Sequence, residues 1–408
     1  MDDIVLSPDQ ETACTKLIEA LIRGERVLVL TGSAGTGKTT LVRVLIERIR
    51  ELGWNAQYAA STGKAAVRLS QTVGLPATTV HAALYGSVRE TLEGQPVFLD
   101  PKPPCTGKTV LVVDEASMID EALDLEIRSQ MPRDSVLLYV GDRNQLPPVV
   151  GNFGPNFAEP TAILTEIHRR ALDNPITQIS CTILAGGKLP MDPIGDTYCR
   201  SQASLAAVAS FVTEQQEAGK DLVVLCWTND VRQRMNRLIR RNLGYDKEGP
   251  VTVNDRLLVL YNNRKLGRMN GEVARVKEVL PFEDSPWMKR TIQSGVPATE
   301  QEMAGLCVRL EPDTQAFIHP GLIGAPLQEF RDFTRKGGLR LTDVHSWLHV
   351  DYGQAITVHR SQGSEWATVV FLIDRSTRLM AKKNPDQARQ LVYTGITRAK
   401  ERLHVFDV

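Results

Sequence analysis

Residues 26–39 read RVLVLTGSAGTGKT, and this stretch decides the fold. It begins with an apolar, β-branched run, Arg26–Thr31, which predicts a strand. The glycine-rich segment Gly32–Thr39 fits the P-loop pattern G-x-x-x-x-G-K-[ST] without a mismatch. Lys38–Leu52 then carries apolar residues at helical spacing and ends at Gly53. A strand, a glycine-rich turn and a helix in this order form the context in which the pattern binds phosphate.

The residues of this loop have distinct expected roles. Glycines let backbone N–H groups close around phosphates, and Lys38 would reach the β- and γ-phosphates. The Thr39 hydroxyl would bind Mg²⁺. The alternative is a glycine-rich turn without a ligand. We expect the nucleotide to be bound by Gly35, Thr36, Gly37, Lys38, Thr39 and Thr40.

Two further apolar runs end in polar residues suited to the same chemistry. Val110–Val113 leads into Asp114 and Glu115, and two carboxylates after a buried strand are costly unless a cation sits beside them. Asp114 would bind Mg²⁺, and Glu115 would act as general base on an attacking water. Val136–Val140 is followed by GDRNQLPP, in which Gln145 would hold water or sense the γ-phosphate. A plain polar loop is the alternative for Gln145.

The overall composition is that of an ordinary globular protein. The chain has 408 residues, which suggests two to three domains at about 150 residues each. Lys and Arg total 48, as do Asp and Glu, so the zero net charge excludes bulk-charge binding of nucleic acid but not a segregated patch. The apolar runs are strand-sized, the N-terminus carries no signal segment, and the six cysteines lie far apart. We therefore expect a cytoplasmic protein with reduced thiols.

Strands and helices alternate through the first third of the chain, which predicts a doubly wound α/β domain with a parallel sheet. A second α/β pattern begins near Asp221, with a strand at Leu222–Trp227 and a helix at Asn229–Leu243. It resumes at Ala355, with further strands at Thr368–Ile373 and Leu403–Val408.

Two segments break this alternation. Ser87–Lys108 predicts a hairpin with a proline-rich return. Asn254–Val279 has alternating apolar residues and the dipeptide Asn270-Gly271, which is a strong hairpin signal and suggests a small inserted barrel. Residues 281–350 read as irregular and rich in Pro and Gly.

Eight segments, in order, resemble the motifs of superfamily 1 helicases of the 5′-to-3′ class, nearest the RecD and Dda-like group. They are GSAGTGKTT, STGKAA, TTVHAAL, VVDEAS, GDRNQLPPV, TEIHRR, TVHRSQGSEW and VYTGITRAKERL. The resemblance runs from Gln10 to the C-terminus and is weakest over 281–350. It implies two RecA-like P-loop motor domains in tandem, 1–86 with 109–172 and 173–253 with 351–408. It also implies a β-hairpin pin at 87–108 and an SH3-like β-barrel at 254–350.

The resemblance assigns further nucleotide contacts. Gln10 would read the adenine edge, with an exposed polar residue as the alternative. Arg169 would contact the γ-phosphate, although the adjacent Arg170 could take that place. His168 would lie against the adenine ring or be structural. Arg398 matches an arginine finger, worth roughly 10³–10⁵ in rate. Two further positions lie near the nucleotide in the family: Gly363 would give the backbone room beside the nucleotide, and Glu365 would lie near the ribose.

The resemblance also implies a track for single-stranded DNA across both motor domains. The matching residues are Thr62, Lys64, Thr79, His81, Thr357, His359 and Ser361, with Thr228 and Asn229 as further candidates. Asn229 could instead cap the following helix. Phe98 would stack on bases at the pin or be buried. Asp230–Arg275 holds 11 Lys/Arg and 5 Asp/Glu, an excess of six, which indicates a DNA-facing surface or a solvated helix face.

We therefore predict an ATP-dependent DNA helicase that uses Mg²⁺ and moves 5′ to 3′ on single-stranded DNA, with the polarity implied by resemblance alone. The expected partners are single-stranded DNA and junctions with duplex, bound by a monomeric motor. The alternatives are a translocase on duplex DNA without strand separation and a nucleotide-switched binding module. A P-loop kinase is the weakest alternative, because it leaves the second α/β half unexplained.

Overall fold

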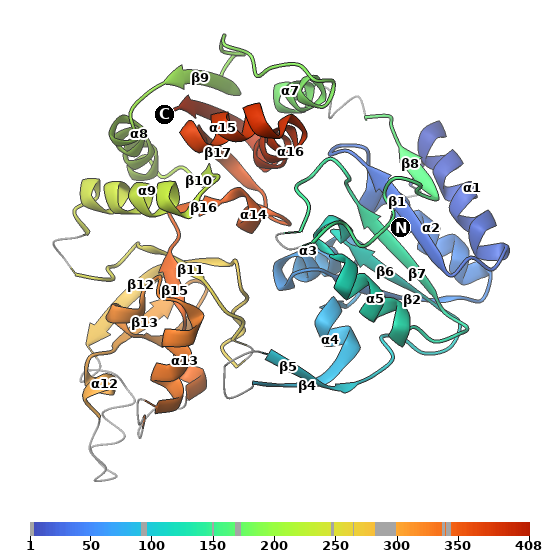
Figure 1. Cartoon of the computed structure of the whole chain (residues 1–408), viewed down its shortest axis with the longest axis horizontal. Coiled ribbons are helices and arrows are strands. Elements are labelled where there is room, and N and C mark those ends of the chain that lie inside the picture. Colours follow the sequence, from blue (N-terminus) through green and yellow to red (C-terminus); the bar gives the residue numbers. More distant parts are fainter. Residues whose placement is uncertain are drawn as a thin grey trace.

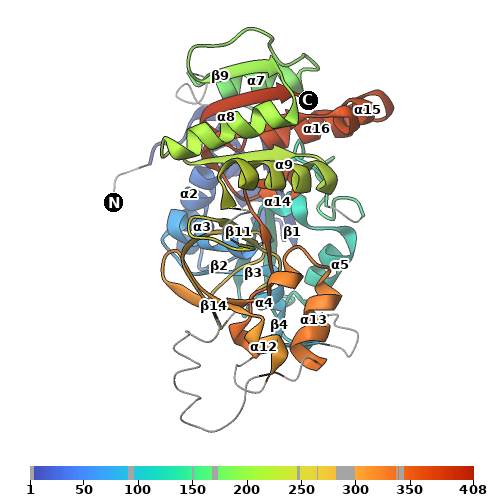
Figure 2. The same cartoon turned by 90° about the vertical axis from the view of Figure 1, so that its left-hand side faces the viewer.

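The computed structural model describes residues 4–90, 96–148, 151–167, 173–245, 249–263, 265–281, 299–336, 339 and 344–408. Two α/β lobes lie beside one another, and a small antiparallel sheet lies next to the second lobe (Figure 1). Figure 2 shows α8 (Leu205–Glu217) and α9 (Asn229–Asn242) crossing the second lobe above that small sheet. None of the described helices is long and apolar enough to cross a membrane.

The first lobe is a six-stranded parallel sheet with the order β3-β2-β6-β7-β1-β8. Its strands are β1 (Val27–Gly32), β2 (Asn55–Ala60), β3 (Ala77–Thr79), β6 (Thr109–Asp114), β7 (Val136–Gly141) and β8 (Ala162–Leu164). Its helices are α1 (Pro8–Ile22), α2 (Lys38–Glu51), α3 (Gly63–Val73), α4 (Val80–Leu84), η1 (Ala116–Met118) and α5 (Glu121–Gln130). The central strands are apolar throughout because α1 and α2 pack on one face of the sheet and α4 and α5 on the other.

The second lobe repeats this plan with a five-stranded parallel sheet of order β16-β10-β17-β18-β9. Its strands are β9 (Tyr198–Gln202), β10 (Leu222–Cys226), β16 (Ala355–Thr357), β17 (Trp366–Ile373) and β18 (Ala399–Asp407). Besides α8 and α9, its helices are α7 (Pro175–Leu184), α14 (Val358–Ser361), α15 (Arg375–Lys383) and α16 (Pro385–Ile396). The predicted pair of α/β domains with parallel sheets is confirmed.

Two antiparallel units interrupt these lobes. A hairpin of β4 (Tyr85–Glu90) and β5 (Pro96–Pro101) leaves the first lobe and extends toward the small sheet in Figure 1. The small sheet has the order β14-β13-β12-β11-β15. Its strands are β11 (Arg256–Val259), β12 (Val273–Pro281), β13 (Leu306–Leu310), β14 (Thr314–Ile318) and β15 (Val350–Tyr352). The accompanying helices are α12 (Glu300–Met303), η3 (Pro320–Leu322), α13 (Leu327–Lys336) and η4 (Val344–Ser346).

The structure corrects two sequence expectations in this region. The described part of residues 281–350 is not irregular, because it supplies β13, β14 and the start of β15. The sequence of β13 lacks an alternation of apolar and polar residues because both faces of this strand are covered. Val308 packs in one apolar cluster, and Cys307 packs in another together with residues of α13. The Asn270-Gly271 dipeptide lies at the end of a long connection between β11 and β12, and does not close a tight hairpin.

Candidate nucleotide site and nucleic-acid track

The P-loop joins β1 to α2 through two glycines in the left-handed region, Gly35 (φ 82°) and Gly37 (φ 75°). The ammonium of Lys38 turns back over the loop and donates to the carbonyls of Gly32 (2.6 Å) and Ser33 (3.0 Å). A cation held across a glycine loop at a helix N-terminus is suited to phosphate.

Three threonines of this loop differ in what they can offer a ligand. The Thr36 hydroxyl is buried and donates to the Ser33 carbonyl at 2.9 Å, so its side chain belongs to the loop itself. A Cβ on Gly32 would lie 2.7 Å from that hydroxyl oxygen, which explains the glycine there. Thr39 is half-buried in the first turn of α2, and Thr40 is exposed. Thr39 is therefore the threonine placed to bind a cation.

Asp114 and Glu115 end β6 in a strained arrangement. Glu115 has a φ of 51°, and its N–H donates to the Asp114 carboxylate at 2.8 Å. Burial and the neighbouring Glu115 charge raise the pKa of Asp114 to about 6, against the opposing effect of Lys38. A divalent cation would relieve this penalty, so the donor set fits Mg²⁺, which Asp114 and Thr39 would hold.

Gln10 lies under the P-loop and is only 2% exposed, so the alternative that Gln10 is an exposed polar residue is wrong. Its amide donates to the carbonyls of Thr36 (3.4 Å) and Gly37 (3.3 Å), and its oxygen accepts from the Ser7 N–H. Gln10 thus connects the capping box of α1 to the loop.

Gln145 follows β7 in a buried turn rather than a plain exposed loop. Its side-chain oxygen is buried without a hydrogen-bond partner among the described residues. A buried polar atom of this kind is costly, and a ligand or water would satisfy it. The turn faces the second lobe, since the Leu146 N–H donates to the Thr394 hydroxyl at 2.8 Å and Gln362 donates to the Leu146 carbonyl at 3.0 Å.

Arg398 is 4% exposed and lies just after α16. Its guanidinium donates to the carbonyls of Thr394 (3.1 Å) and Ser364 (3.4 Å) and to the Thr397 hydroxyl (3.3 Å). These partners are neutral, and no carboxylate among the described residues forms an ion pair with this guanidinium. His168, Arg169 and the adjacent Arg170 lie outside the described residues.

Gly363 and Glu365 lie against α3 of the first lobe. The Glu365 carboxylate pairs with Arg68 at 2.6 Å and with Lys400 at 3.5 Å. Gly363 has a φ of 71°, and a Cβ there would lie 3.3 Å from Ala65. In the sheet, the strand before α3 is three positions from the strand before the P-loop, roughly 14 Å away at 4.8 Å per strand. A ribose contact for Glu365 stays a prediction and requires these ion pairs to open.

In the first lobe, the expected track residues lie at two helix N-termini. Thr62 caps α3 by accepting from the Ala65 N–H, and Thr79 caps α4 by accepting from the Ala82 N–H, both at 3.2 Å. A hydroxyl that accepts in this way still has a proton to donate to a phosphate.

The two basic side chains of this part of the track are half-buried. Lys64 lies over the ring of Trp366 in the second lobe, 5.0 Å from its centroid. Burial lowers the pKa of Lys64 and also that of His81. His81 lines a hollow of the first lobe together with Ser61 and Asp120.

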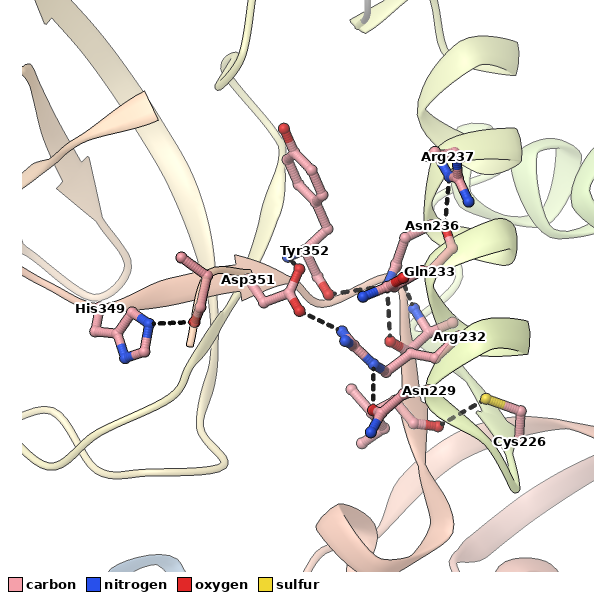
Figure 3. A network of polar contacts seen from close by, with 12 residues as sticks. Cys226, Asn229, Arg232, Gln233, Asn236, Arg237, His349, Asp351 and Tyr352 are labelled. Atoms are coloured by element: carbon pink, nitrogen blue, oxygen red, sulfur yellow. Dashed lines mark hydrogen bonds and ion pairs between the residues drawn. The ribbon is translucent and has the colours of Figure 1, made fainter. Parts of the chain in front are cut away.

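In the second lobe, Thr228 caps α9 by accepting from the Val231 N–H at 3.4 Å, so the capping alternative for Asn229 is wrong. Asn229 instead accepts from Arg232 at 3.1 Å (Figure 3). The same guanidinium forms an ion pair with Asp351 of β15 at 2.6 Å. Arg232 therefore connects a candidate DNA residue to the small sheet.

Asn236 extends this network along α9 (Figure 3). Its amide donates to the carbonyls of Tyr352 (3.0 Å) and Ala355 (3.1 Å), and its oxygen accepts from the Ala355 N–H. One turn further, Arg240 forms a buried ion pair with Asp255. Two of the five arginines of α9 are therefore used inside the protein, and only Arg234, Arg237 and Arg241 are exposed for a DNA-facing surface.

The segment 357–361 offers less to DNA than expected. Ser361 is fully buried and donates to the Val358 carbonyl at 2.7 Å. The predicted direct contact between Ser361 and DNA is therefore wrong for this conformation. Thr357 is 8% exposed, and His359 packs on Trp227 with ring centroids 5.1 Å apart. Phe98 lies in β5 opposite Val88, and its side chain falls outside what the structure describes.

Both lobes match known protein families. Residues 5–191 match an AAA domain, and residues 352–406 match the UvrD-like helicase C-terminal domain. The ATP-dependent RecD2 DNA helicase of Deinococcus radiodurans is 29% identical over 402 residues, 93% of this chain and 47% of that protein. The ATP-dependent DNA helicase dda of phage T4 is 27% identical over 255 residues, 58% of this chain and 57% of that protein. The chain thus spans about half the length of these relatives.

Two solved structures share the fold. Pif1 helicase from Bacteroides, in complex with ADP-AlF3 and ssDNA, has a TM-score of 0.53 and 16% identity, covering 99% of this chain and 92% of that one. Pif1 helicase from Candida albicans has a TM-score of 0.51 and 17% identity, covering 99% and 94%. The chain is therefore similar in sequence to proteins named as ATP-dependent DNA helicases and similar in fold to Pif1 helicases, with family matches in both lobes.

Proposed function

We propose that this chain is an ATP-dependent DNA helicase that moves 5′ to 3′ along single-stranded DNA. The observation that carries the proposal is the junction between the lobes. The second lobe contacts the P-loop lobe at Leu146 through Thr394 and Gln362, and it brings the buried guanidinium of Arg398 with it. A nucleotide bound at the P-loop would close this junction and its hydrolysis would loosen it, which is how a motor alternates between two states.

The P-loop residues and Gln10 would bind ATP, and Asp114 and Thr39 would hold Mg²⁺. The metal would neutralise charge on the transferred phosphate. Glu115 would take the proton of the attacking water, and Arg398 would stabilise negative charge that develops opposite it. Arg169 and His168 would complete the proposed nucleotide contacts. Kinship with proteins named as ATP-dependent DNA helicases supports this assignment.

Single-stranded DNA would cross the N-termini of α3, α4 and α9, where Thr62, Thr79 and Thr228 cap the helices. Hydroxyls and backbone N–H groups at such positions suit contacts with phosphates that do not depend on sequence. The β4–β5 hairpin would separate the duplex, braced by the small sheet as an SH3-like unit.

Strand displacement tests function and polarity together. The purified chain, ATP and Mg²⁺ are mixed with duplexes that carry a 5′ or a 3′ single-stranded tail. We expect displacement only from the 5′-tailed duplex. Displacement from the 3′ tail alone would reverse the polarity, and ATP hydrolysis without stimulation by single-stranded DNA would favour a nucleotide-switched binding module.

A variant in which a Gly-Ser linker replaces the hairpin residues 86–100 tests the pin. We expect this variant to keep ATP hydrolysis stimulated by single-stranded DNA and to lose strand displacement. If displacement survives, the pin is rejected. If wild-type protein moves on DNA without displacing any strand, a translocase without strand separation is the better description.

A further inference from the structure

Tyr393, a residue outside the proposed catalytic set, spans the junction between the lobes. It lies near the end of α16 and is fully buried. Its hydroxyl accepts from the N–H of Ala34 in the P-loop at 2.8 Å and donates to the carboxylate of Asp142 at 2.6 Å. Both partners belong to the first lobe, so one hydroxyl of the second lobe joins the P-loop to the turn after β7.

The burial of Asp142 makes this contact important. Asp142 is 1% exposed, and its other carboxylate oxygen accepts from the Asn144 N–H at 3.0 Å. A buried carboxylate is costly unless donors surround it, and Tyr393 supplies one of them. When the lobes separate, that donor would have to be replaced by water.

The position of Tyr393 also determines where Arg398 lies. Thr394, the next residue, accepts from the Leu146 N–H through its hydroxyl, and its carbonyl accepts from the Nε of Arg398. The Thr397 N–H donates to the Tyr393 carbonyl, which continues the last turn of α16 to Arg398. A continuous series of contacts therefore runs from the P-loop to the proposed arginine finger.

We propose that Tyr393 is a positioning residue, which docks the end of α16 on the P-loop and Asp142 and so sets Arg398 for hydrolysis. This inference rests on the proposed function. Tyr393 itself does not touch the reacting atoms. Its single hydroxyl must meet two partners on different segments of the first lobe, so this contact fixes how the two lobes are oriented in the closed junction.

The test measures ATP hydrolysis stimulated by single-stranded DNA in Tyr393→Phe, Asp142→Asn and the double variant. A lost hydrogen bond to a buried charge is expected to lower kcat about tenfold or more in each single variant. If the two residues act through one bond, the double variant loses about as much as either single variant. Tyr198→Phe is the matched control, because Tyr198 is also buried and its hydroxyl donates to the Pro190 carbonyl at 2.6 Å, within its own lobe. We expect it to keep kcat within about twofold.

The outcomes separate this inference from the proposed function. Wild-type protein without DNA-stimulated hydrolysis would overturn the function itself. Stimulated wild-type protein with an equally active Tyr393→Phe would overturn only the role of Tyr393. Losses that multiply in the double variant, or equal losses in Tyr198→Phe with a matching fall in Tm, would reduce Tyr393 to a structural tyrosine.

Discussion

At the residue scale, Glu115 is the side chain whose backbone most clearly points to function. A φ of 51° is unfavourable for any residue but glycine, and such strain is kept where it fixes a functional group. Glu115→Gln preserves size and removes the charge of the proposed general base. We expect ATP turnover, measured as phosphate release with single-stranded DNA present, to fall roughly 10²–10⁴-fold. Binding of a fluorescent ATP analogue should be retained.

Glu121→Gln serves as the control for this change. Glu121 is an exposed carboxylate in the first turn of α5, on the same lobe, and is expected to leave turnover within about twofold. Near-normal turnover in Glu115→Gln would reject Glu115 as the base. Loss of nucleotide binding would show instead that the charge is needed to hold the site together.

The positions of the candidate catalytic residues could be predicted from the sequence because their spacing is tied to one strand and one turn. Lys38 follows an apolar strand across the glycine-rich loop, and Asp114 ends another apolar strand, so a local pattern is sufficient. Ser361 and Tyr393 show the limit of this reasoning. Whether a hydroxyl faces DNA, its own helix or another lobe depends on tertiary packing, which local spacing does not encode. The same holds for Asn229, whose partner Arg232 is fixed by Asp351 in a distant strand.

At the scale of elements, the ion pair of Arg232 and Asp351 holds the small sheet against α9. The two side chains are 6% and 9% exposed, so removing one partner leaves a buried charge. We expect Arg232→Met to lower the free energy of unfolding by about 3–5 kcal/mol, measured by denaturant titration. Because Arg232 also binds Asn229, DNA affinity should fall as well.

Arg234→Met is the matched control on the same helix. Arg234 is exposed and pairs with the exposed Asp230 at 3.7 Å, a kind of pair worth about 0.3–0.5 kcal/mol. Equal destabilisation by the two substitutions would show that the buried network does not brace the small sheet. A larger loss of DNA affinity for Arg234→Met would point to the exposed face of α9 as the main DNA surface.

The parallel sheets were predictable because their strands are continuous apolar runs that alternate with helices. The small sheet was only half predictable. Strands β11 and β12 were visible in the sequence, whereas β13 and β14 are covered on both faces and so lack an alternating pattern. Their turns contain Pro and Gly, which are also typical of irregular structure. Strand β11 pairs with β15, some 90 residues further along the chain, and no local sequence pattern predicts such a pairing.

At the scale of the whole molecule, the ion pairs of Glu365 connect the two lobes. Its carboxylate joins Arg68 of the first lobe and Lys400 of the second, and the pair with Arg68 is partly exposed. Such a pair contributes about 0–1 kcal/mol, which changes the closed population up to about fivefold. We expect Glu365→Gln and Arg68→Gln to lower DNA-stimulated ATP hydrolysis by similar, severalfold factors at low salt. Both effects should shrink at high salt, because the Debye length falls from about 30 Å at 0.01 M to about 3 Å at 1 M.

The resemblance to helicases gives Glu365 a different role, at the ribose, and the two roles predict different kinetics. A contact with the ribose would raise the KM for ATP in Glu365→Gln and leave Arg68→Gln unaffected. A contact between the lobes would change both variants alike, and the double charge swap Arg68→Glu with Glu365→Arg would recover part of the lost rate. Arg43→Gln is the control, since Arg43 pairs with Glu47 within α2 of the first lobe and should leave the rate unchanged. A raised KM confined to Glu365→Gln would show that the nucleotide, when bound, draws this carboxylate away from Arg68.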